Sequence, residues 1–290
     1  MLVEAKLNNF PYTLEAEGKK ANKKSSPFKH ISAKEKMIYG LIGIIAFSTF
    51  AVLIWILSYI FFKGIGHIDL IGLIPAIITT IYMVVMGLVI AVPVGMGTAI
   101  YLSEYARPSK FVKGIRFSTE CLAAVPSILF GLFGMMFFVT QMKMGYSILA
   151  GGLTVSLMIL PTVVKTTEEA LKTVPGSYRE GSLALGASKF ATIMKVVVPS
   201  AIPGVLTGIV FSTGRIIGET AAIYLTAGMV FRVPSTAMES GRTLAVHLYM
   251  LAKEGISLEE AYGVAIVLLL IVFGLNLLTY VIGGKMKNGK

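Results

Sequence analysis

The segment SYREGSLALGASKFATIMKVVVP, residues 177–199, lies between two apolar spans and predicts two short helices joined by a tight turn. Ser177 and Glu180 have the spacing of a capping box, in which the two side chains bond to the free amides of a helix start. Gly186 can adopt the left-handed conformation that ends a helix, here after two turns. Ser188 has the side chain of an N-cap, so a second helix should follow.

The composition of the whole chain indicates an integral membrane protein. Hydrophobic residues make up 55% of the 290 residues, charged residues only 14%, and the mean hydropathy is +0.79. Soluble domains carry roughly a quarter charged residues. Because the chain has a single cysteine, Cys121, it cannot form an internal disulfide. We expect the Cys121 side chain to be a small, buried apolar group.

Six runs without Asp, Glu, Lys or Arg are long enough to cross a bilayer, for which about 20 helical residues suffice. They are Met37–Phe62, Leu70–Ser103, Cys121–Met142, Met144–Val164, Val196–Gly214 and Ala261–Gly284. We therefore predict an all-α, polytopic membrane protein with six transmembrane helices. The second run has 34 residues, too many for one untilted span, so we expect a break or kink near Pro93. Pro126 and Pro161 should mark further kinks.

Basic residues are distributed unequally between the two sides that six spans define. The N-terminal segment, the 104–117 and 165–195 connections and the C-terminal tail hold 20 of the 26 Lys and Arg residues. The other three connections hold five, and Arg215 lies in the fifth span. Because cytoplasmic segments are enriched in Lys and Arg, both termini and the 177–199 segment should face the cytoplasm. This unequal distribution of basic residues between the two sides of the membrane accounts for the net charge of +11. A nucleic-acid partner is therefore not needed to explain the charge, and we infer none.

The chain divides into three parts. Residues 1–36 should form a cytoplasmic, largely disordered basic arm that ends at the start of the first membrane helix. Residues 37–284 should form the transmembrane domain, with a cytoplasmic loop at about 165–199, and residues 285–290 a cytoplasmic tail. Two further capping-box pairs should begin the first and last membrane helices: Ser32 with Glu35, and Ser257 with Glu260.

The quoted segment matches the signature of ABC importer permeases. Glu180, Gly186 and Pro199 stand at the spacing of its E-A-A…G…I-x-L-P pattern, with Gly181 and Ser182 in place of the two alanines. The segment therefore resembles the coupling helices of that family, which fit a cleft on an ATPase subunit. The resemblance also implies the type I, MetI-like permease architecture.

By this resemblance, five residues are assigned to ATPase coupling: Ser177, Tyr178, Arg179, Glu180 and Gly186. Glu180 and Gly186 should transmit ATPase closure to the membrane helices through packing and capping, not through catalysis. An ordinary amphipathic surface helix is the alternative. A DNA-binding helix-turn-helix has the same shape, but tethering to two membrane spans disfavours it.

Four further stretches resemble the permeases of the bacterial phosphate-specific importer, and its A-type subunit more than its C-type subunit. They are PVGMGTAIYLSEYA (93–106), LPTVVKTTEEALKTVPGSYRE (160–180), GRIIGETAAIYLTAG (214–228) and TLAVHLYMLAKEG (243–255). The C-type subunit usually has a larger outer insertion after its first helix, whereas Lys63–Leu70 is short. The resemblance covers about residues 37–284.

The resemblance also implies partners. These are a homologous permease subunit of the C type, two ATPase subunits, an extracytoplasmic phosphate-binding protein and the lipid of a bacterial or archaeal cell (inner) membrane. The chain lacks the phosphate-loop pattern G-x-x-x-x-G-K-[ST] and any nucleophile–base constellation. We therefore predict that it is not an enzyme and binds no cofactor or metal, and that ATP and Mg²⁺ bind the partner ATPase.

Ionisable residues in the fifth span mark a candidate translocation pathway. A central Arg in a membrane costs roughly 2.5–3.5 kcal/mol on insertion scales, so Arg215 should face protein or water. On one continued helix, Ser212, Arg215, Glu219 and Thr226 share a stripe with Gly204–Gly208, which permits close helix approach. Two interpretations are open. Either Arg215 and Glu219 form an i,i+4 ion pair that locks one helix against its neighbour, or Arg215 attracts an anion while Glu219 holds the guanidinium group of Arg215 in place.

The substrate stays open at this point, because Arg215 would serve phosphonate, sulfate or molybdate as well as phosphate. A passive channel or a membrane scaffold, with the loop as a surface element, is the alternative of another class. His67 and His247 lie in outer connections without ligand spacing, so we expect no metal site.

Overall fold

The computed structural model describes the backbone of residues 33–288 and the side chains of residues 35 and 37–277. Most of the predicted N-terminal arm, Ser32 of the first predicted capping box and the last two residues lie outside this part. The described residues up to Ile56 belong to one unit and the residues from Leu57 onward to a second, and each unit is described by itself.

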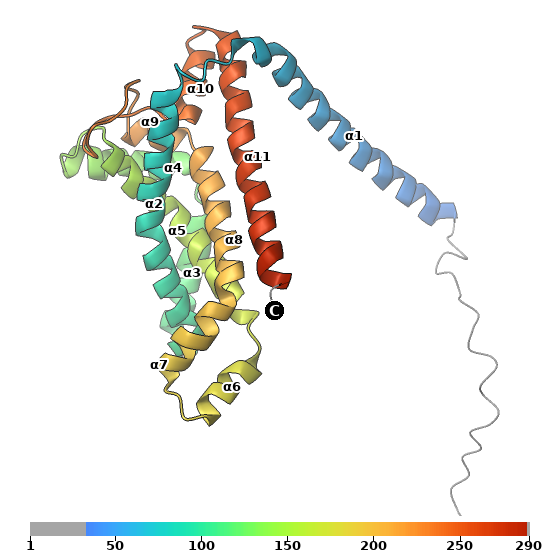
Figure 1. The fold of residues 1–290 in the computed structure, drawn as a ribbon, viewed down its shortest axis with the longest axis vertical. Coiled ribbons are helices and arrows are strands. Elements are labelled where there is room, and N and C mark those ends of the chain that lie inside the picture. Colours follow the sequence, from blue (N-terminus) through green and yellow to red (C-terminus); the bar gives the residue numbers. More distant parts are fainter. Residues whose placement is uncertain (1–32, 289–290) are drawn as a thin grey trace, which may run out of the picture. The chain divides into compact units, whose positions relative to one another are not determined.

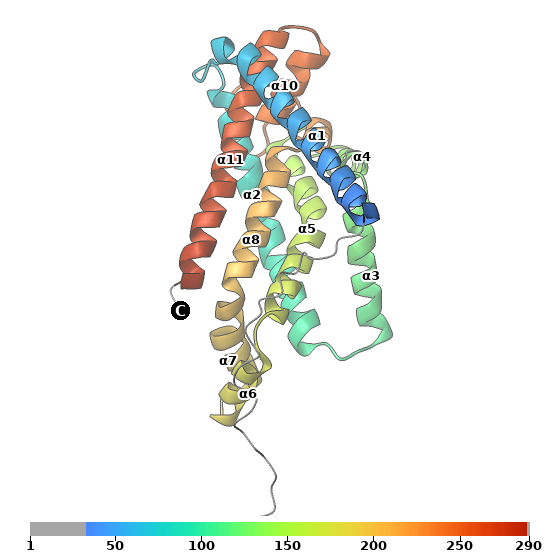
Figure 2. The ribbon, with the colours of Figure 1, turned by 90° about the vertical axis from the view of Figure 1, so that its right-hand side faces the viewer.

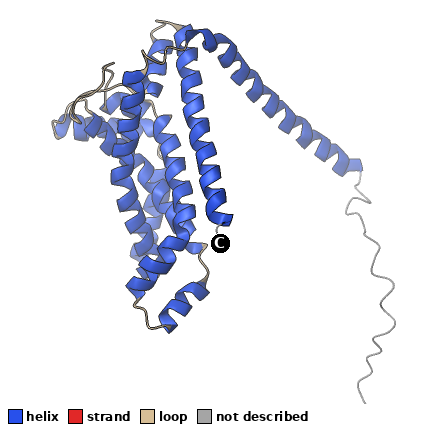
Figure 3. Cartoon of the chain, viewed as in Figure 1, coloured by secondary structure: helices blue, strands red, loops and turns tan. Residues whose placement is uncertain are grey.

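All secondary structure in the described residues is helical (Figure 3), which confirms the all-α prediction. In chain order the helices are α1 (Ala33–Gly64), α2 (Ile74–Ile100), α3 (Lys110–Ala124), α4 (Ser127–Gly134), α5 (Ile148–Lys172), α6 (Gly176–Ala184), α7 (Lys189–Thr192), α8 (Val198–Ile217), α9 (Ala221–Thr226), α10 (Leu244–Lys253) and α11 (Leu258–Asn288). α1 continues as the 3-10 turn η2 (Ile65–His67). Three other helices continue as π-helical segments: α2 as η3 (Tyr101–Tyr105), α4 as η4 (Met135–Gln141) and α7 as η5 (Ile193–Val197).

Five rods in the described residues are long and apolar enough to cross a membrane: α1, α2 with η3, α5, α7 with η5 and α8, and α11. The first unit is the part of α1 up to Ile56, where every described side chain is exposed. A helix that is apolar all round must meet lipid or another protein.

The last helix begins as predicted. Ser257 Oγ accepts from the Glu260 amide at 3.1 Å, which confirms Ser257 as the cap of α11.

The third predicted span, Cys121–Met142, is kinked at Pro126 as predicted, so sharply that it divides into two helices. The chain turns by 99° between α3 and α4 with η4, and six crossings result only if this bent pair counts as one. Pro126 causes the corner, because its ring excludes the preceding residue from the helical region. Val125 accordingly has φ −68° and ψ 130°.

The second predicted span does not break at Pro93. α2 continues through it into η3, so that Ile74–Tyr105 is one rod of 32 residues. Membrane helices accommodate proline where neighbouring helices and π-turns satisfy the freed carbonyl groups. Pro161 likewise lies inside α5. Neither proline therefore ends its helix.

α5 lies against both α2 and α8 in the second unit (Figures 1 and 2). Glycines make the close approach possible. A methyl group added at Gly95 of α2 would lie 2.7 Å from Val163 Cγ1, and one at Gly204 of α8 would lie 2.7 Å from Ala170 Cβ. This is the small-residue packing by which membrane helices associate, and it agrees with the close approach expected at the α8 glycines.

Short helices gather at the two ends of the second unit. α6 and α7 lie at the end where η3 and α5 finish, here called the α6 end (Figures 1 and 2). α9 and α10 lie at the opposite end, the α10 end. There the chain after α9 turns back over the start of α5, where the amides of Ile148 and Leu149 donate to the carbonyl oxygens of Glu239 and Ala237 at 2.9 and 2.8 Å.

Gly208→Ala should destabilise the protein, because the added methyl group would lie 2.7 Å from Thr166 Cβ on α5. Overpacking of this kind costs about 1–3 kcal/mol, so the purified protein should unfold at a lower temperature. Gly214→Ala on the same helix is the matched control, because nothing lies within 4 Å of its added methyl group. Equal unfolding temperatures for the two variants would contradict the packing assignment.

Candidate functional site

The helix predicted to begin with a Ser177–Glu180 capping box begins differently. α6 starts at Gly176, its N-cap is Pro175, and no side chain caps it. Pro175 has φ −58° and ψ 141°, so the chain enters the helix earlier than the capping box requires. Ser177 and Glu180 lie inside α6 with exposed side chains, and the capping-box prediction is wrong.

The turn at Gly186 forms as predicted. Gly186 has a φ of +80°, in the left-handed region of backbone conformations that residues other than glycine rarely adopt. Its amide donates to the carbonyl oxygen of Leu183 at 2.9 Å, and the amide of Ala187 donates to that of Ser182 at 3.2 Å. These two bonds define a Schellman motif, which ends α6 after nine residues.

The second helix of the segment is continuous with a membrane span. Ser188 Oγ accepts from the Ala191 amide at 3.2 Å, which confirms Ser188 as the N-cap of α7. α7 continues through η5 into α8, with Pro199 in the first turn of α8, and the rod Lys189–Ile217 has 29 residues. The glycine turn therefore joins α6 directly to a membrane-spanning helix.

α6, the turn and α7 with η5 carry large apolar side chains that the described chain leaves uncovered. Leu185 is 90% exposed. We call the following set the α6 patch: Tyr178, Leu183, Leu185, Phe190 and Met194. Exposed apolar patches mark surfaces that contact another protein or the membrane.

Arg179 points away from this surface and into the bundle. Its Nη2 and Nε donate to Oε1 and Oε2 of Glu104 at 2.6 and 3.2 Å. Its Nη1 and Nη2 also donate to the carbonyl oxygens of Val174 and Leu171 at 2.8 and 3.0 Å. The hydrogen bond to Glu104 raises the pKa of Arg179 above its usual value, although burial acts in the opposite direction. Arg179 thus fastens α6 to the ends of α2 and α5.

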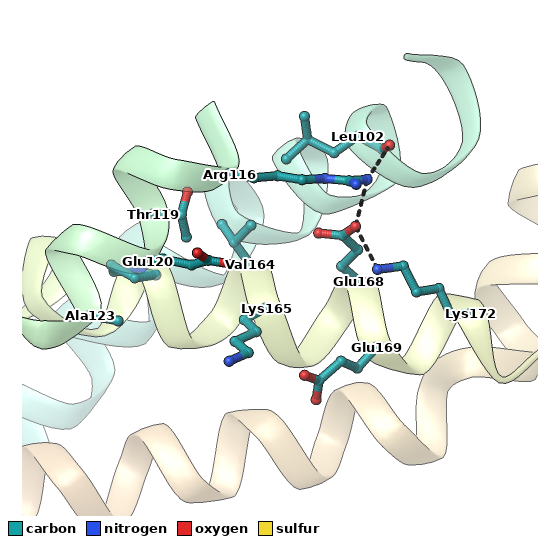
Figure 4. Close-up of a pocket in the computed structure, with 11 residues that line it drawn as sticks. Leu102, Arg116, Thr119, Glu120, Ala123, Val164, Lys165, Glu168, Glu169 and Lys172 are labelled. Carbon is teal, nitrogen blue, oxygen red and sulfur yellow. Dashed lines mark hydrogen bonds and ion pairs between the residues drawn. The ribbon is translucent and has the colours of Figure 1, made fainter. Parts of the chain in front are cut away.

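A second ion cluster lies at the same end (Figure 4). The Glu168 carboxylate lies 2.7 Å from Arg116 Nη2 and 2.8 Å from Lys172 Nζ. Arg116 also donates to the carbonyl oxygen of Leu102 at 3.4 Å. These groups border a cavity of about 330 Å³ whose lining carries charges of both signs. The cluster ties α3 to α5. The cavity lining as a whole has equal numbers of basic and acidic side chains, so it offers no net positive charge to an anion.

Of the predicted pathway residues, Ser212 and Arg215 lie on α8. Ser212 is fully buried, and within the described chain its Oγ has no hydrogen-bond partner. Arg215 is half-buried, and its Nη1 donates to Thr162 Oγ1 of α5 at 3.3 Å. Arg215 therefore contacts protein, in agreement with the cost of exposing it to lipid.

The predicted stripe along a single helix is wrong beyond Ile217. α8 ends at Ile217, and its C-cap is Gly218, a residue of low helix propensity. Glu219 Oε1 then accepts from the amide of Ala222 at 3.1 Å and thereby caps α9. The polar positions after Gly218 therefore leave the face of α8.

Arg215 and Glu219 are not an ion pair in the described part of the chain. Glu219 is 8% exposed and its carboxylate is bonded to the Ala222 amide. Thr226, also buried, donates its Oγ1 to the Ala222 carbonyl at 2.6 Å. The predicted contact between Arg215 and Glu219 is therefore wrong in both interpretations, because the observed partner of Arg215 is the neutral Thr162.

Residues 91–286, more than half of the chain, match the family described as "Binding-protein-dependent transport system inner membrane component". The matched range includes α6, the Gly186 turn and Arg215. The chain belongs to this family.

Curated relatives agree. "Probable ABC transporter permease protein YqgI" of Bacillus subtilis (strain 168) is 31% identical over 257 residues, which cover 80% of this chain and 87% of that protein. "Phosphate transport system permease protein PstA" of Mycobacterium leprae (strain TN) is 29% identical over 278 residues, covering 88% and 91%. The PstA of Haemophilus influenzae is 37% identical over 188 residues, covering 60% and 66%. The resemblance to ABC importer permeases is confirmed.

Solved structures share the fold of this permease. A bacterial alginate ABC transporter, in complex with an alginate pentasaccharide-bound periplasmic protein, gives a TM-score of 0.64 at 13% identity, covering 85% of this chain and 93% of that one. The inward-facing MetNI methionine ABC transporter gives 0.57 at 19% identity, covering 74% and 94%. At these identities the likeness shows the fold alone, and it confirms the MetI-like architecture.

Sequence reasoning missed Glu104 and Glu168 as structural residues of the permease. Both lie in stretches that carry the phosphate-importer resemblance. The partner of Glu104, however, is 75 residues away along the chain, so no local pattern identifies it. The available signal was chemical: a carboxylate at the end of an apolar run must find a cation, a hydrogen-bond donor or water.

His247 is held in an aromatic and cationic setting at the α10 end. Its ring stacks on Phe231 with centroids 4.3 Å apart, and Arg242 Nη1 donates to its Nδ1 at 3.3 Å. Burial, and then the charge of Arg242, lower the pKa of His247 to about 4. No group of three or more His, Cys, Asp or Glu side chains in the described range could hold a metal ion.

This low pKa predicts that acid destabilises the α10 end. An unfolded histidine titrates near pH 6.5, about 2.5 units above the folded pKa of His247. The unfolded state therefore binds more protons between these two values, and stability should fall as the pH drops from 6.5 to 4. Between about pH 7 and pH 5, the unfolding temperature should fall more for the wild type and for a His67→Gln control than for His247→Gln. Equal falls in all three would contradict the assignment.

Proposed function

We propose that this permease forms half of the translocation pathway of an ATP-driven importer of inorganic phosphate, with a homologous C-type permease subunit as the other half. Relatives named as phosphate transport permeases support the substrate, and one of them aligns with 88% of this chain. The fold alone does not select it, because alginate and methionine transporters share the fold.

Arg215 carries the proposal. It is a half-buried guanidinium on a membrane rod, and its partner is a hydroxyl group, not a carboxylate. No ion pair in the described chain therefore neutralises its positive charge. A guanidinium stays charged and offers planar donors that suit an oxyanion, whose passage through an apolar barrier would otherwise be prohibitive. Ser212 would line the same pathway, while Glu219 and Thr226 would shape its α9 side.

The α6 end would face the cytoplasm of a bacterial or archaeal cell (inner) membrane, with both termini on that side. The excess of basic residues in the connections of the α6 end supports this orientation. The α10 end would then face outward, toward an extracytoplasmic phosphate-binding protein.

Two ATPase subunits, which bind ATP and Mg²⁺, would contact the permease through the α6 patch. Its uncovered apolar side chains support this assignment, because a water-facing end of a membrane protein gains from covering them. Ser177, Tyr178, Glu180 and Gly186 lie in or beside the patch, whereas Arg179 is turned inward. The permease would contribute motion and a pathway, and the partner would contribute catalysis.

The deciding experiment is uptake of labelled phosphate into vesicles that contain the complete complex. Uptake should require ATP and the binding protein, and excess unlabelled phosphate should compete while sulfate, molybdate and phosphonate should not. Uptake of one of these oxyanions in place of phosphate would replace the substrate. Uptake that persists without ATP would indicate a passive channel.

Arg215→Lys should lower phosphate uptake by about tenfold or more, because an ammonium group cannot reproduce the planar set of donors. The ATPase subunits should still copurify, since no ion pair of the described chain is lost. Thr162→Ser is the control, because it keeps the hydroxyl that Arg215 contacts. Normal uptake by Arg215→Lys would remove Arg215 from the mechanism.

Gly186→Val should uncouple ATP hydrolysis from uptake or prevent ATPase docking. Its φ of +80° would strain a β-branched residue by about 1–2 kcal/mol or more, so the α6 patch would be displaced. Gly181→Ala is the matched control, because it lies inside α6 and nothing lies within 4 Å of its added methyl group. Wild-type hydrolysis and uptake in Gly186→Val would refute the coupling assignment.

A further inference from the structure

The chain itself connects α6 to only two membrane rods. A three-residue connection joins its start to α5, and the Gly186 turn joins its end to α7 and α8. Ser182 strengthens the second connection, because its hydroxyl lies 2.9 Å from Thr192 Oγ1. α2 has no covalent connection to α6 nearby, yet Arg179 of α6 binds Glu104 at the end of α2.

We propose that the Arg179–Glu104 ion pair is a mechanical link that passes displacements of α6 to α2. The inference rests on the proposed role of α6 as the ATPase contact. Within the described residues, Arg179 and Ser182 are the α6 side chains that hydrogen-bond outside the helix, and Arg179 alone reaches α2. Arg179 is thus a positioning residue of the permease.

The geometry makes this link stiff. Both carboxylate oxygens of Glu104 accept from the guanidinium, and the planar fork fixes orientation as well as distance. The same guanidinium donates to the carbonyl oxygens of Leu171, in the last turn of α5, and of Val174, in the connection that follows. The side chains of Arg179 and Glu104 are only 25% and 9% exposed, so water and salt screen the pair weakly.

The position of Glu104 determines how far the link reaches. Glu104 lies in η3, the last turn of a rod that begins at Ile74 near the α10 end. At 1.5 Å per residue, the 32 residues of this rod span roughly 48 Å. A displacement of α6 would therefore act on the α10 end through α2 as well as through α5 and α8. Loss of the ion pair would remove the α2 path without touching the α6 patch.

The first test measures phosphate transported per ATP hydrolysed in the reconstituted complex. Arg179→Gln and Glu104→Gln should each lower this ratio about tenfold or more while the ATPase subunits remain bound. The double variant should be no worse than either single variant, because both remove the same link. Arg107→Gln, at an exposed arginine three residues beyond Glu104, is the control and should keep the wild-type ratio.

Arg179→Lys separates transmission from folding, because it keeps the charge but loses the two-point contact. It should assemble normally and still show a lowered ratio, even if the glutamine variants fail to assemble. A wild-type ratio in Arg179→Lys or Arg179→Gln, or additive losses in the double variant, would overturn the proposal.

The second test needs no substrate. Spin labels at Ala184 of α6, outside the α6 patch, and Tyr101 of η3, both exposed, report their separation in a Cys121→Ser background. When nucleotide is trapped on the ATPase subunits, the distance distribution should stay unchanged in the wild type and broaden in Arg179→Gln. The same response in both proteins would overturn the link. Failure of the wild type to move phosphate would instead count against the proposed substrate.

Discussion

The close packing of α5 against α2 and α8 is the contact on which the other features depend. Glycines on the facing helices remove side-chain bulk and bring the three rods together. Along α5, Thr162 then contacts Arg215, Glu168 contacts Arg116, and the last carbonyl groups accept from Arg179. A change in the position of α5 would therefore reach the half-buried guanidinium and the α6 end together.

α6 combines two kinds of surface in nine residues. Uncovered apolar groups such as Leu185 suit contact with a separate protein, while Arg179 binds Glu104 and the end of α5. A helix that contacted only a separate protein could move without displacing the membrane rods. A helix that contacted only the membrane rods would not be displaced by a partner. The proposed importer needs both kinds of contact.

Local chemistry explains which features the sequence could predict. Charge-free runs, the positive φ of Gly186 and the cap at Ser188 depend on residues close together in the chain, and these predictions hold. The corner at Pro126 depends on whether neighbouring helices accept a proline, as they do inside α2 and α5, so proline alone could not distinguish a corner from a continuous rod. Glu219 was assigned by helical periodicity, which fails once its carboxylate caps a new helix. The partner of Arg179 lies 75 residues away, beyond any local pattern.

The most direct test of the account places a cysteine at Leu185 in a Cys121→Ser background and measures what it contacts in intact cells and in the purified complex. A membrane-impermeant thiol reagent added outside should leave it unlabelled, and a short bifunctional crosslinker should join it to an ATPase subunit with a yield that changes when nucleotide is trapped. Labelling from outside, or no crosslink to any ATPase, would contradict a cytoplasmic helix that transmits ATPase motion to the membrane rods.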